Sequence, residues 1–311
     1  MRGIAVSPWN TGFLPLSPIG SNQYPRKVWI MATKKTEKLA NKVSEKGLTR
    51  YNFIAGVLHL VSAIALTAIL AQVKVQGYFP VTADWMQGPP GFKVGDQVGP
   101  LTIQPPQHVV LFTLNLGGAI IAFLLLSAIF HFAIISPFFK KRYFDGLANT
   151  HNYFRWTEYS LSSSVMITSI MLLNGFTDFA GLIAVFAVNA SMILFGALQE
   201  KYEKPGNGKA LPYIMGCMTG VVPWIIIGIS AFRPGYTGAN QIPGFVIGII
   251  VTIFIAFNTF AINQALQYRQ VGKWKDYLFG ERVYITLSFV AKSLLAWQVF
   301  SGAIIPALAN N

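Results

Sequence analysis

The most unusual chemical feature of the sequence is Lys292, at the centre of the apolar stretch YITLSFVAKSLLAWQVF, residues 284–300. A cation in the middle of a hydrophobic membrane helix costs several kcal/mol, so its presence indicates a functional role or a specific partner. Burial in an apolar medium favours the neutral amine, and a neutral lysine amine can attack an aldehyde to form a Schiff base. A protonated Schiff base would then need a counterion.

Glu158 is the carboxylate best placed to serve as this counterion. Counting along the predicted helices at ~1.5 Å per residue puts Lys292, Glu158, His59 and His131 roughly 7–14 Å below the same membrane boundary. Ser288 precedes Lys292 by four residues, so it shares the same face of its helix. A structural salt bridge that joins two helices is the alternative interpretation of the lysine and the glutamate.

Aromatic and sulfur-containing residues on other helices could line a slot for a flat polyene near this layer. The candidates are Tyr159, Met166, Met192, Trp224 and Phe257, with Asn189 as a polar contact and Gln264 at a similar depth to Lys292. Each residue taken alone is also compatible with core packing or lipid contact. Their grouping around a central lysine is what favours a binding pocket.

Seven apolar segments must position these residues. The chain has 311 residues, 53% of them hydrophobic and 11% charged, which is too apolar for an ordinary soluble domain. A membrane helix needs roughly 20 mostly apolar residues, and the sequence contains seven such windows. They cover residues 51–74, 108–136, 153–175, 178–199, 210–232, 242–268 and 283–308, and the seventh could begin earlier, near Asp276. The predicted fold is an all-α membrane protein built as a bundle of seven helices.

The positive charge of the chain indicates its orientation in the membrane. The net charge is +13, but its distribution argues against a nucleic-acid partner. Twenty of the 24 Lys and Arg residues lie in residues 1–50 and in or near the loops after the second, fourth and sixth spans. Positive residues stay cytoplasmic, so the N-terminus is predicted inside the cell and the C-terminus outside.

Two regions outside the spans have distinctive compositions. Residues 1–50 form a basic N-terminal segment, in which residues 1–30 are either disordered or an overlong start ahead of Met31, and residues 51–309 form the membrane domain. In the loop at 75–107, the alternation in VKVQGYF and FKVGDQV predicts an external β-hairpin, with an irregular loop as the alternative. Cys217 is the single cysteine, which excludes an intrachain disulfide and a cysteine metal cluster. With no metal site and no nucleophile–base set in view, the protein is predicted not to be an enzyme.

Four motifs together resemble one family of retinal proteins. RWTEYSLSSSVMI in the third span, LSFVAKSLLAWQVF in the seventh, SAIFHF in the second and GVLHL in the first are similar to heliorhodopsins, over about residues 45–309. The predicted inside N-terminus agrees, because heliorhodopsins are inverted relative to other microbial rhodopsins. The resemblance implies a rhodopsin-like bundle that binds all-trans-retinal, and it favours a homodimer.

The same resemblance implies a role for each candidate residue. Lys292 would carry retinal as a Schiff base, Glu158 would be its sole counterion, and Ser288 would contact the Schiff-base region. His59 and His131, with water, would form a cavity that accepts the proton. The pocket would be completed by Tyr159, Asn189, Met192, Trp224, Phe257 and Gln264.

Differences from ion-pumping rhodopsins predict that this chain does not pump. Pumps of that type keep a carboxylate four residues before the retinal lysine, where this chain has Ser288. Eleven residues after Glu158 stands Ser169, and the outer half of the spans has no acid beyond Asp178 at the boundary. A vectorial proton pump needs an acceptor on one side and a donor on the other. The sequence places ionisable groups on one side.

Three functions remain open from the sequence. The first is a light sensor in the cell membrane that acts on an unknown signalling partner. The second is a light-gated ion or proton conductance. The third is a light-dependent regulator of a partner membrane protein or enzyme.

Overall fold

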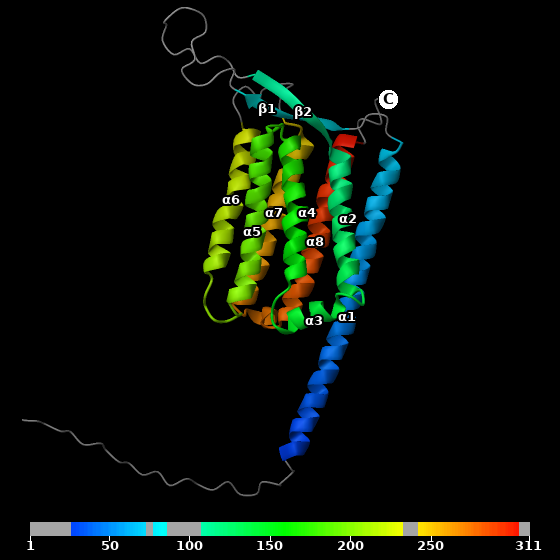
Figure 1. Cartoon of the computed structure of the whole chain (residues 1–311), viewed down its shortest axis with the longest axis vertical. Coiled ribbons are helices and arrows are strands. Elements are labelled where there is room, and N and C mark those ends of the chain that lie inside the picture. The colour runs from blue at the N-terminus through cyan, green and yellow to red at the C-terminus, as the bar shows by residue number, and fades with distance from the viewer. Residues whose placement is uncertain (1–25, 73–76, 86–106, 233–241, 305–311) are drawn as a thin grey trace, which may run out of the picture. The chain divides into compact units, whose positions relative to one another are not determined.

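The structure is a computed structural model that describes residues 26–72, 77–85, 107–232 and 242–304, with side chains from residue 45 to 302 (Figure 1). The chain divides into two units, Met1–Lys46 and Gly47–Asn311. All the predicted site residues belong to the second unit, which is a bundle of long helices.

The order of elements follows the predicted spans closely. The helices and strands are α1 (Arg26–Leu70), β1 (Tyr78–Trp85), β2 (Gln107–Asn115), α2 (Leu116–Ile135), α3 (Lys140–Ala148), α4 (Tyr153–Leu173), α5 (Phe179–Tyr202), α6 (Leu211–Ala231), α7 (Gly244–Tyr268), a 3₁₀ turn η2 (Gly272–Lys275), α8 (Tyr277–Val299) and a π-helical turn η3 (Phe300–Ile304). Asp276 caps the N-terminus of α8, with its side chain accepting a hydrogen bond from the Leu278 amide at 2.9 Å. The early start of the seventh span is therefore confirmed.

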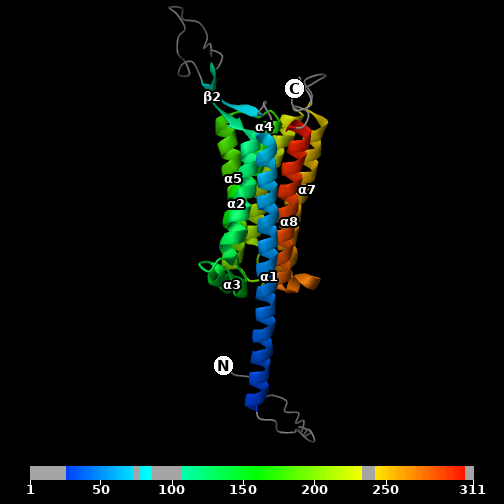
Figure 2. The same ribbon diagram turned by 90° about the vertical axis from the view of Figure 1, so that its right-hand side faces the viewer.

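Within the described residues, six helices are long and apolar enough to cross a bilayer on length and composition alone. They are α1 from Glu45, α2, α5, α6, α7 and α8. The seventh long helix, α4, has 21 residues but is more polar, and it runs alongside α2 and α5 in the bundle (Figure 1). Figure 2 shows the bundle part of α1 between α2 and α8. The predicted bundle of seven long helices is confirmed within the described part of the chain.

The polarity of α4 comes largely from serines whose hydroxyls bond to the helix itself. Ser163 donates to the Tyr159 carbonyl at 2.6 Å, and Ser164 donates to the Ser160 carbonyl at 2.6 Å. Such bonds to the preceding turn satisfy a hydroxyl without water. The helix can therefore stay in an apolar bundle, where an unpaired polar group would be costly. Its C-terminal half packs Met166, Ile167 and Ile170 into the main hydrophobic core.

The loop between α1 and α2 contains the predicted hairpin, but one strand comes from a segment predicted as helix. β1 and β2 are antiparallel, from Tyr78 opposite Asn115 to Trp85 opposite Gln107. Residues 108–115, predicted as the beginning of the second span, form most of β2, and α2 begins at Leu116. The segment HVVLFTLN is rich in β-branched and aromatic residues, which favour a strand. The Asn115 side chain then accepts a hydrogen bond from the Gly118 amide and ends the strand by capping α2.

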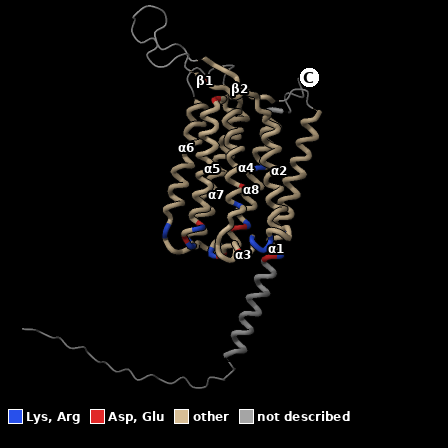
Figure 3. The backbone as a smooth tube through the Cα atoms, in the orientation of Figure 1, with Lys and Arg blue, Asp and Glu red and all other residues tan. Residues whose placement is uncertain are grey.

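The hairpin lies across one end of the bundle. The Thr82 amide donates to the Thr177 carbonyl at 2.9 Å, just before α5 begins. His108 is exposed on the hairpin, with Nδ1 2.8 Å from Asp84 Oδ1 on the opposite strand. The predicted strand FKVGDQV lies outside the described residues. Charged residues gather at the other end of the bundle, around α3 and the neighbouring loops (Figure 3).

Candidate functional site

Lys292 lies on the buried face of α8, and its ammonium contacts two side chains. The residue is 3% exposed. Its Nζ donates to Glu158 Oε1 at 2.7 Å and to Ser288 Oγ at 2.8 Å. Ser288 stands one helical turn before Lys292, so both residues face α4, where Glu158 lies. The two charges form a neutral pair in the interior of the bundle.

Glu158 is held by more than the lysine. Ser127 on α2 lies with Oγ 2.7 Å from Glu158 Oε1 and 3.0 Å from the Phe123 carbonyl of its own helix, so its single hydroxyl proton is shared between these two acceptors. The ring of Tyr159 lies 5.1 Å from Lys292 Nζ, and its hydroxyl donates to the Tyr284 carbonyl at 2.9 Å. The ion pair is therefore braced from α2, α4 and α8, and its geometry is set by the packing of three helices.

The two predicted histidines lie together near this pair. The rings of His59 and His131 stack with centroids 5.7 Å apart and 13° between their planes. His131 Nδ1 lies 2.8 Å from Asn52 Oδ1, whereas neither nitrogen of His59 has a hydrogen-bond partner within the described structure. A cavity of about 30 Å³ is bordered by His131, Asn52, Glu158 and Arg155, among other residues. A polar space of this size accommodates a single water molecule.

A much larger cavity begins at the lysine and extends between the helices. Its volume is about 360 Å³, in the range of small-molecule sites. Its walls are mostly apolar and aromatic, with a few polar groups that include Ser163, Gln264, Ser288 and Lys292. The lining includes Trp156, Tyr159, Ser162, Ser163, Met166, Met192, Tyr213, Trp224, Phe254, Phe257, Phe260, Gln264, Tyr284, Ser288, Ala291 and Lys292. An elongated apolar ligand with one reactive end fits this arrangement.

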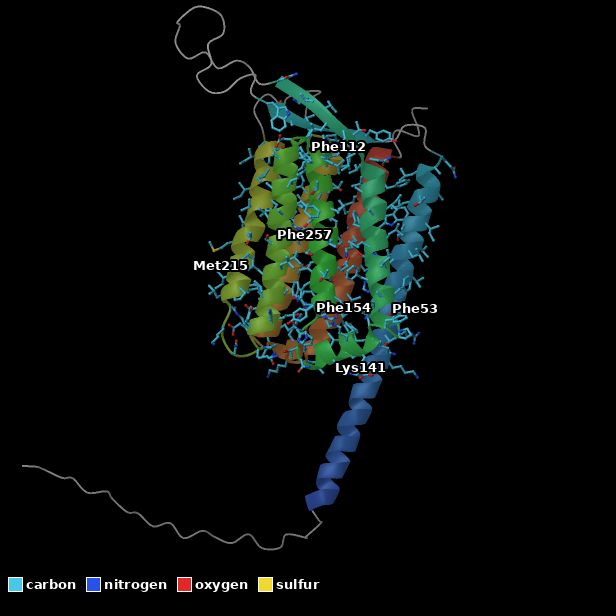
Figure 4. The ribbon with its side chains drawn as sticks, viewed as in Figure 1. Phe53, Phe112, Lys141, Phe154, Met215 and Phe257 are labelled. Carbon is cyan, nitrogen blue, oxygen red and sulfur yellow. The ribbon has the colours of Figure 1, made fainter. Side chains whose placement is uncertain are left out.

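The structure brings most predicted pocket residues to this one cavity. Tyr159, Met192, Trp224, Phe257 and Gln264 line it together with Ser288 and Lys292, and Figure 4 shows Phe257 within the bundle.

Asn189 and Glu158 stand apart from the wall of the large cavity. Asn189 Nδ2 donates to Ser163 Oγ at 2.8 Å and to Ser164 Oγ at 3.0 Å, so it acts on the pocket through Ser163. Glu158 borders the small polar cavity.

Several lining residues were not predicted, although helical periodicity points to them. Trp156 precedes Tyr159 by three residues and Ser163 follows it by four, so both share its face of α4 with the predicted Met166, which also lines the cavity. Tyr213 and Phe254 precede the predicted Trp224 and Phe257 by eleven and three residues on their helices. Following the face of each predicted residue for one to three turns in both directions would have found them.

A second buried group of charges borders the small cavity. The side chain of Arg155 is 3% exposed and bonds to Glu200 on α5 and Glu281 on α8. The guanidinium lies 4.0 Å from the ring centroid of Tyr284. Glu200 and Glu281 were not recognised as buried acids, because each stands at the end of a predicted span next to exposed charges.

The two carboxylates of this group have many donors. Glu281 Oε1 accepts from Asn152 Nδ2 at 2.7 Å and from the Tyr143 hydroxyl at 3.3 Å. Glu200 Oε2 accepts from Trp156 Nε1 at 2.6 Å, and Gly196, one turn earlier on α5, leaves space for the Trp156 ring. A Cβ on that glycine would meet the ring at 2.5 Å. The group thus connects α3, α4, α5 and α8 at the charged end of the bundle.

We expect Arg155→Met to destabilise the protein strongly. The substitution leaves Glu200 and Glu281 buried without their cation, and breaking a buried pair in this way typically costs about 3–5 kcal/mol. Thermal unfolding followed by far-UV circular dichroism measures the effect. Lys141→Met is the matched control, because it removes one positive charge from an exposed pair with Asp145. Equal melting temperatures for the two variants would contradict a structural role for the buried group.

Solved structures with the same fold include microbial rhodopsins. The chain aligns with cyanorhodopsin from the cyanobacterium Tolypothrix sp. NIES-4075 at a TM-score of 0.55 and 12% identity, over 85% of this chain and 98% of that one. It aligns with a light-driven proton pump from Leptosphaeria maculans at a TM-score of 0.54 and 13% identity, over 84% and 96% of the two chains. At these identities the likeness defines the fold, which is that of the microbial rhodopsins. The comparison with curated proteins gives no match.

The family follows from the sequence of the bundle itself. The heliorhodopsin family model matches residues 48–304, and the chain belongs to the heliorhodopsin family. It is a multi-pass integral membrane protein and, at the level of its family, a retinal photoreceptor.

Proposed function

We propose that this protein is a light sensor that does not pump ions, with all-trans-retinal attached to Lys292 as a Schiff base and Glu158 as its counterion. The observation that carries the proposal is the Lys292–Glu158 contact of 2.7 Å at the edge of a cavity of about 360 Å³. A lysine amine at the end of an apolar slot fits an aldehyde-bearing polyene. When bound, retinal supplies a light-triggered change of shape beside the lysine nitrogen.

The protein's own residues would control the charge and the proton at that nitrogen. Glu158 compensates the positive charge, while Ser127 and Ser288 orient the carboxylate and the nitrogen through the hydrogen bonds described above. His59 and His131 are proposed to accept the proton after light absorption. Support for this role comes from the position of His131 at the small cavity, from the stacking of His59 on His131, and from the two nitrogens of His59 that have no hydrogen-bond partner among the described residues.

The arrangement of acids supports a function without transport. In the half of the bundle near the hairpin, Asp178 accepts a hydrogen bond from the Gly181 amide at 2.7 Å and caps α5. A carboxylate engaged as a helix cap at the boundary is poorly suited to relay protons. The centre of this half is the apolar cluster that includes Met166, Ile170 and Leu295. A proton that leaves the lysine nitrogen therefore has polar acceptors on the side of the small cavity, whereas the apolar cluster lies on the side of the hairpin.

We expect illuminated cells that express the protein to show no light-driven change in bulk pH. The measurement uses a weakly buffered cell suspension with added retinal, with and without a protonophore. A light-driven proton pump expressed in the same host is the positive control. A reproducible pH change that the protonophore abolishes would contradict the non-pumping proposal.

The orientation, the assembly and the output of the sensor are part of the same proposal. Lys and Arg residues gather at the α3 end of the bundle, which supports a cytoplasmic N-terminus (Figure 3). The proposed domain division remains a basic segment at residues 1–50 and a retinal-binding domain at residues 51–309. A homodimer that acts on a signalling partner, with no catalytic activity of its own, is the proposed working form.

A light-gated conductance is the second candidate. The polar side chains around the small cavity, from His131 and Asn52 to Arg155, favour it as a partial ion path. Whole-cell current recordings under illumination distinguish the two functions, since a sensor gives no photocurrent.

A further inference from the structure

The turn between α2 and α3 exposes apolar and basic side chains next to one another. We call Phe138, Phe139, Lys140 and Arg142 the α2–α3 corner. All four residues are exposed. Figure 4 shows Lys141, which lies on α3 between Lys140 and Arg142, at this end of the bundle. The functional site described above does not use this surface.

The apolar part of the corner lies at the membrane boundary. The membrane helix α2 ends at Ile135, and Phe138 follows three residues later with 88% of its surface exposed. Phe139 contacts Phe154 edge-on, with ring centroids 5.7 Å apart, so the turn is fixed against α4. An aromatic ring held at this depth contacts the acyl chains just below the lipid headgroups.

The basic part of the corner has little acidic compensation. Lys141 pairs with Asp145 at 2.7 Å. Neither Lys140 nor Arg142 forms a salt bridge with any described residue, and the Arg142 guanidinium instead lies 6.0 Å from the centroid of Phe154. Two cations therefore remain free to bind an anion at the same depth as the lipid phosphates. Lysine and arginine are the side chains that bind phosphate oxygens most strongly.

We propose that the α2–α3 corner binds an anionic phospholipid, with Lys140 and Arg142 on its phosphate and the Phe138 ring among its acyl chains. The ligand must be amphiphilic, because the apolar ring and the two cations are only two and four residues apart along the turn. A soluble acidic protein would match the cations but would leave Phe138 to the membrane. The proposal does not depend on retinal.

Native mass spectrometry of the full-length protein tests the proposal. The protein is released from micelles that contain equal amounts of phosphatidylglycerol and phosphatidylcholine, and the ratio of the two bound lipids is measured. Removal of both cations in the variant K140Q/R142Q should lower this ratio by about fivefold or more, given the contribution of one basic side chain near an anionic surface. The matched control is K273Q/K275Q, which removes two exposed cations from η2 and should change the ratio less than twofold. Phe138→Ser keeps the charge and should lower the total amount of retained lipid.

Three results would overturn the proposal. Equal decreases in the lipid ratio for K140Q/R142Q and K273Q/K275Q would mean that phosphatidylglycerol binds through the overall positive charge of this end of the bundle and not at the α2–α3 corner. Displacement of the lipid by soluble glycerophosphoglycerol at similar concentration would mean that the site needs no membrane. A change from dimer to monomer with an unchanged lipid ratio would identify the corner as a contact between two copies. Far-UV circular dichroism checks that each variant is folded. A protein that stays colourless with retinal but still selects phosphatidylglycerol would refute the proposed function and leave the lipid site intact.

Discussion

Replacement of Lys292 by alanine will leave the protein colourless in the presence of all-trans-retinal. The amine of Lys292 is the described lysine nitrogen at the wall of the large cavity, so no other described lysine is placed to attach the chromophore. We expect the complete loss of the visible absorption band, measured on purified protein after incubation with retinal. Lys201→Ala, which changes an exposed lysine on α5, should keep the full band.

A second variant separates loss of attachment from loss of folding. Lys292→Ala alone leaves Glu158 buried without a cation, which destabilises the bundle. The double variant Lys292→Ala/Glu158→Gln removes both charges and should fold, as judged by far-UV circular dichroism, yet remain colourless. An unchanged visible band in this folded double variant would show that retinal is attached elsewhere.

Replacement of Glu158 by glutamine should change both the colour and the proton affinity of the Schiff base. Glutamine keeps the size and hydrogen bonding of the side chain but removes the negative charge 2.7 Å from the Lys292 nitrogen. An adjacent negative charge stabilises a buried cation, so without it the nitrogen loses its proton at lower pH, by several pH units for a desolvated pair. The histidines cannot compensate, because an imidazole is neutral or positively charged. The band should move to the red while the nitrogen is protonated and to the near ultraviolet after deprotonation.

A spectrophotometric pH titration of the wild type and Glu158→Gln in the same salt measures this change. Ser127→Ala removes the serine donor and retains the charge, so its midpoint should stay near that of the wild type. Asp145→Asn removes an exposed carboxylate and should have no effect. Identical midpoints in the wild type and Glu158→Gln would identify Glu158 as a structural acid.

The sequence predicts the centre of this site better than its surroundings. Lys292 and Glu158 could be placed in one layer because each lies well inside an apolar segment, where counting residues gives depth. Glu200 and Glu281 stand at the ends of helices, where a charge looks the same whether it faces water or a buried arginine. Their pairing with Arg155 depends on how α4, α5 and α8 rotate against one another, and a single sequence does not contain that rotation.

The beginning of α2 shows a different reason why a prediction from sequence was wrong. HVVLFTLN and the helix that follows form one continuous apolar run, and hydrophobicity alone does not separate a strand from a helix over such a short stretch. The partner strand β1 and the cap at Asn115 decide the boundary. In the same way, the cavity-lining faces of α6 and α7 become recognisable once Trp224 and Phe257 indicate which side faces the ligand.

The polar character of α4 has a consequence for how the protein is made. Charged residues make the free energy of inserting an isolated segment into a bilayer less favourable. Helix α4 carries Arg155 and Glu158 and is also rich in serine. The partners that neutralise these charges are Glu200, Glu281 and Lys292, and all three are synthesised after α4. During biogenesis α4 is therefore the segment least able to remain in the membrane alone, and completion of α8 secures it.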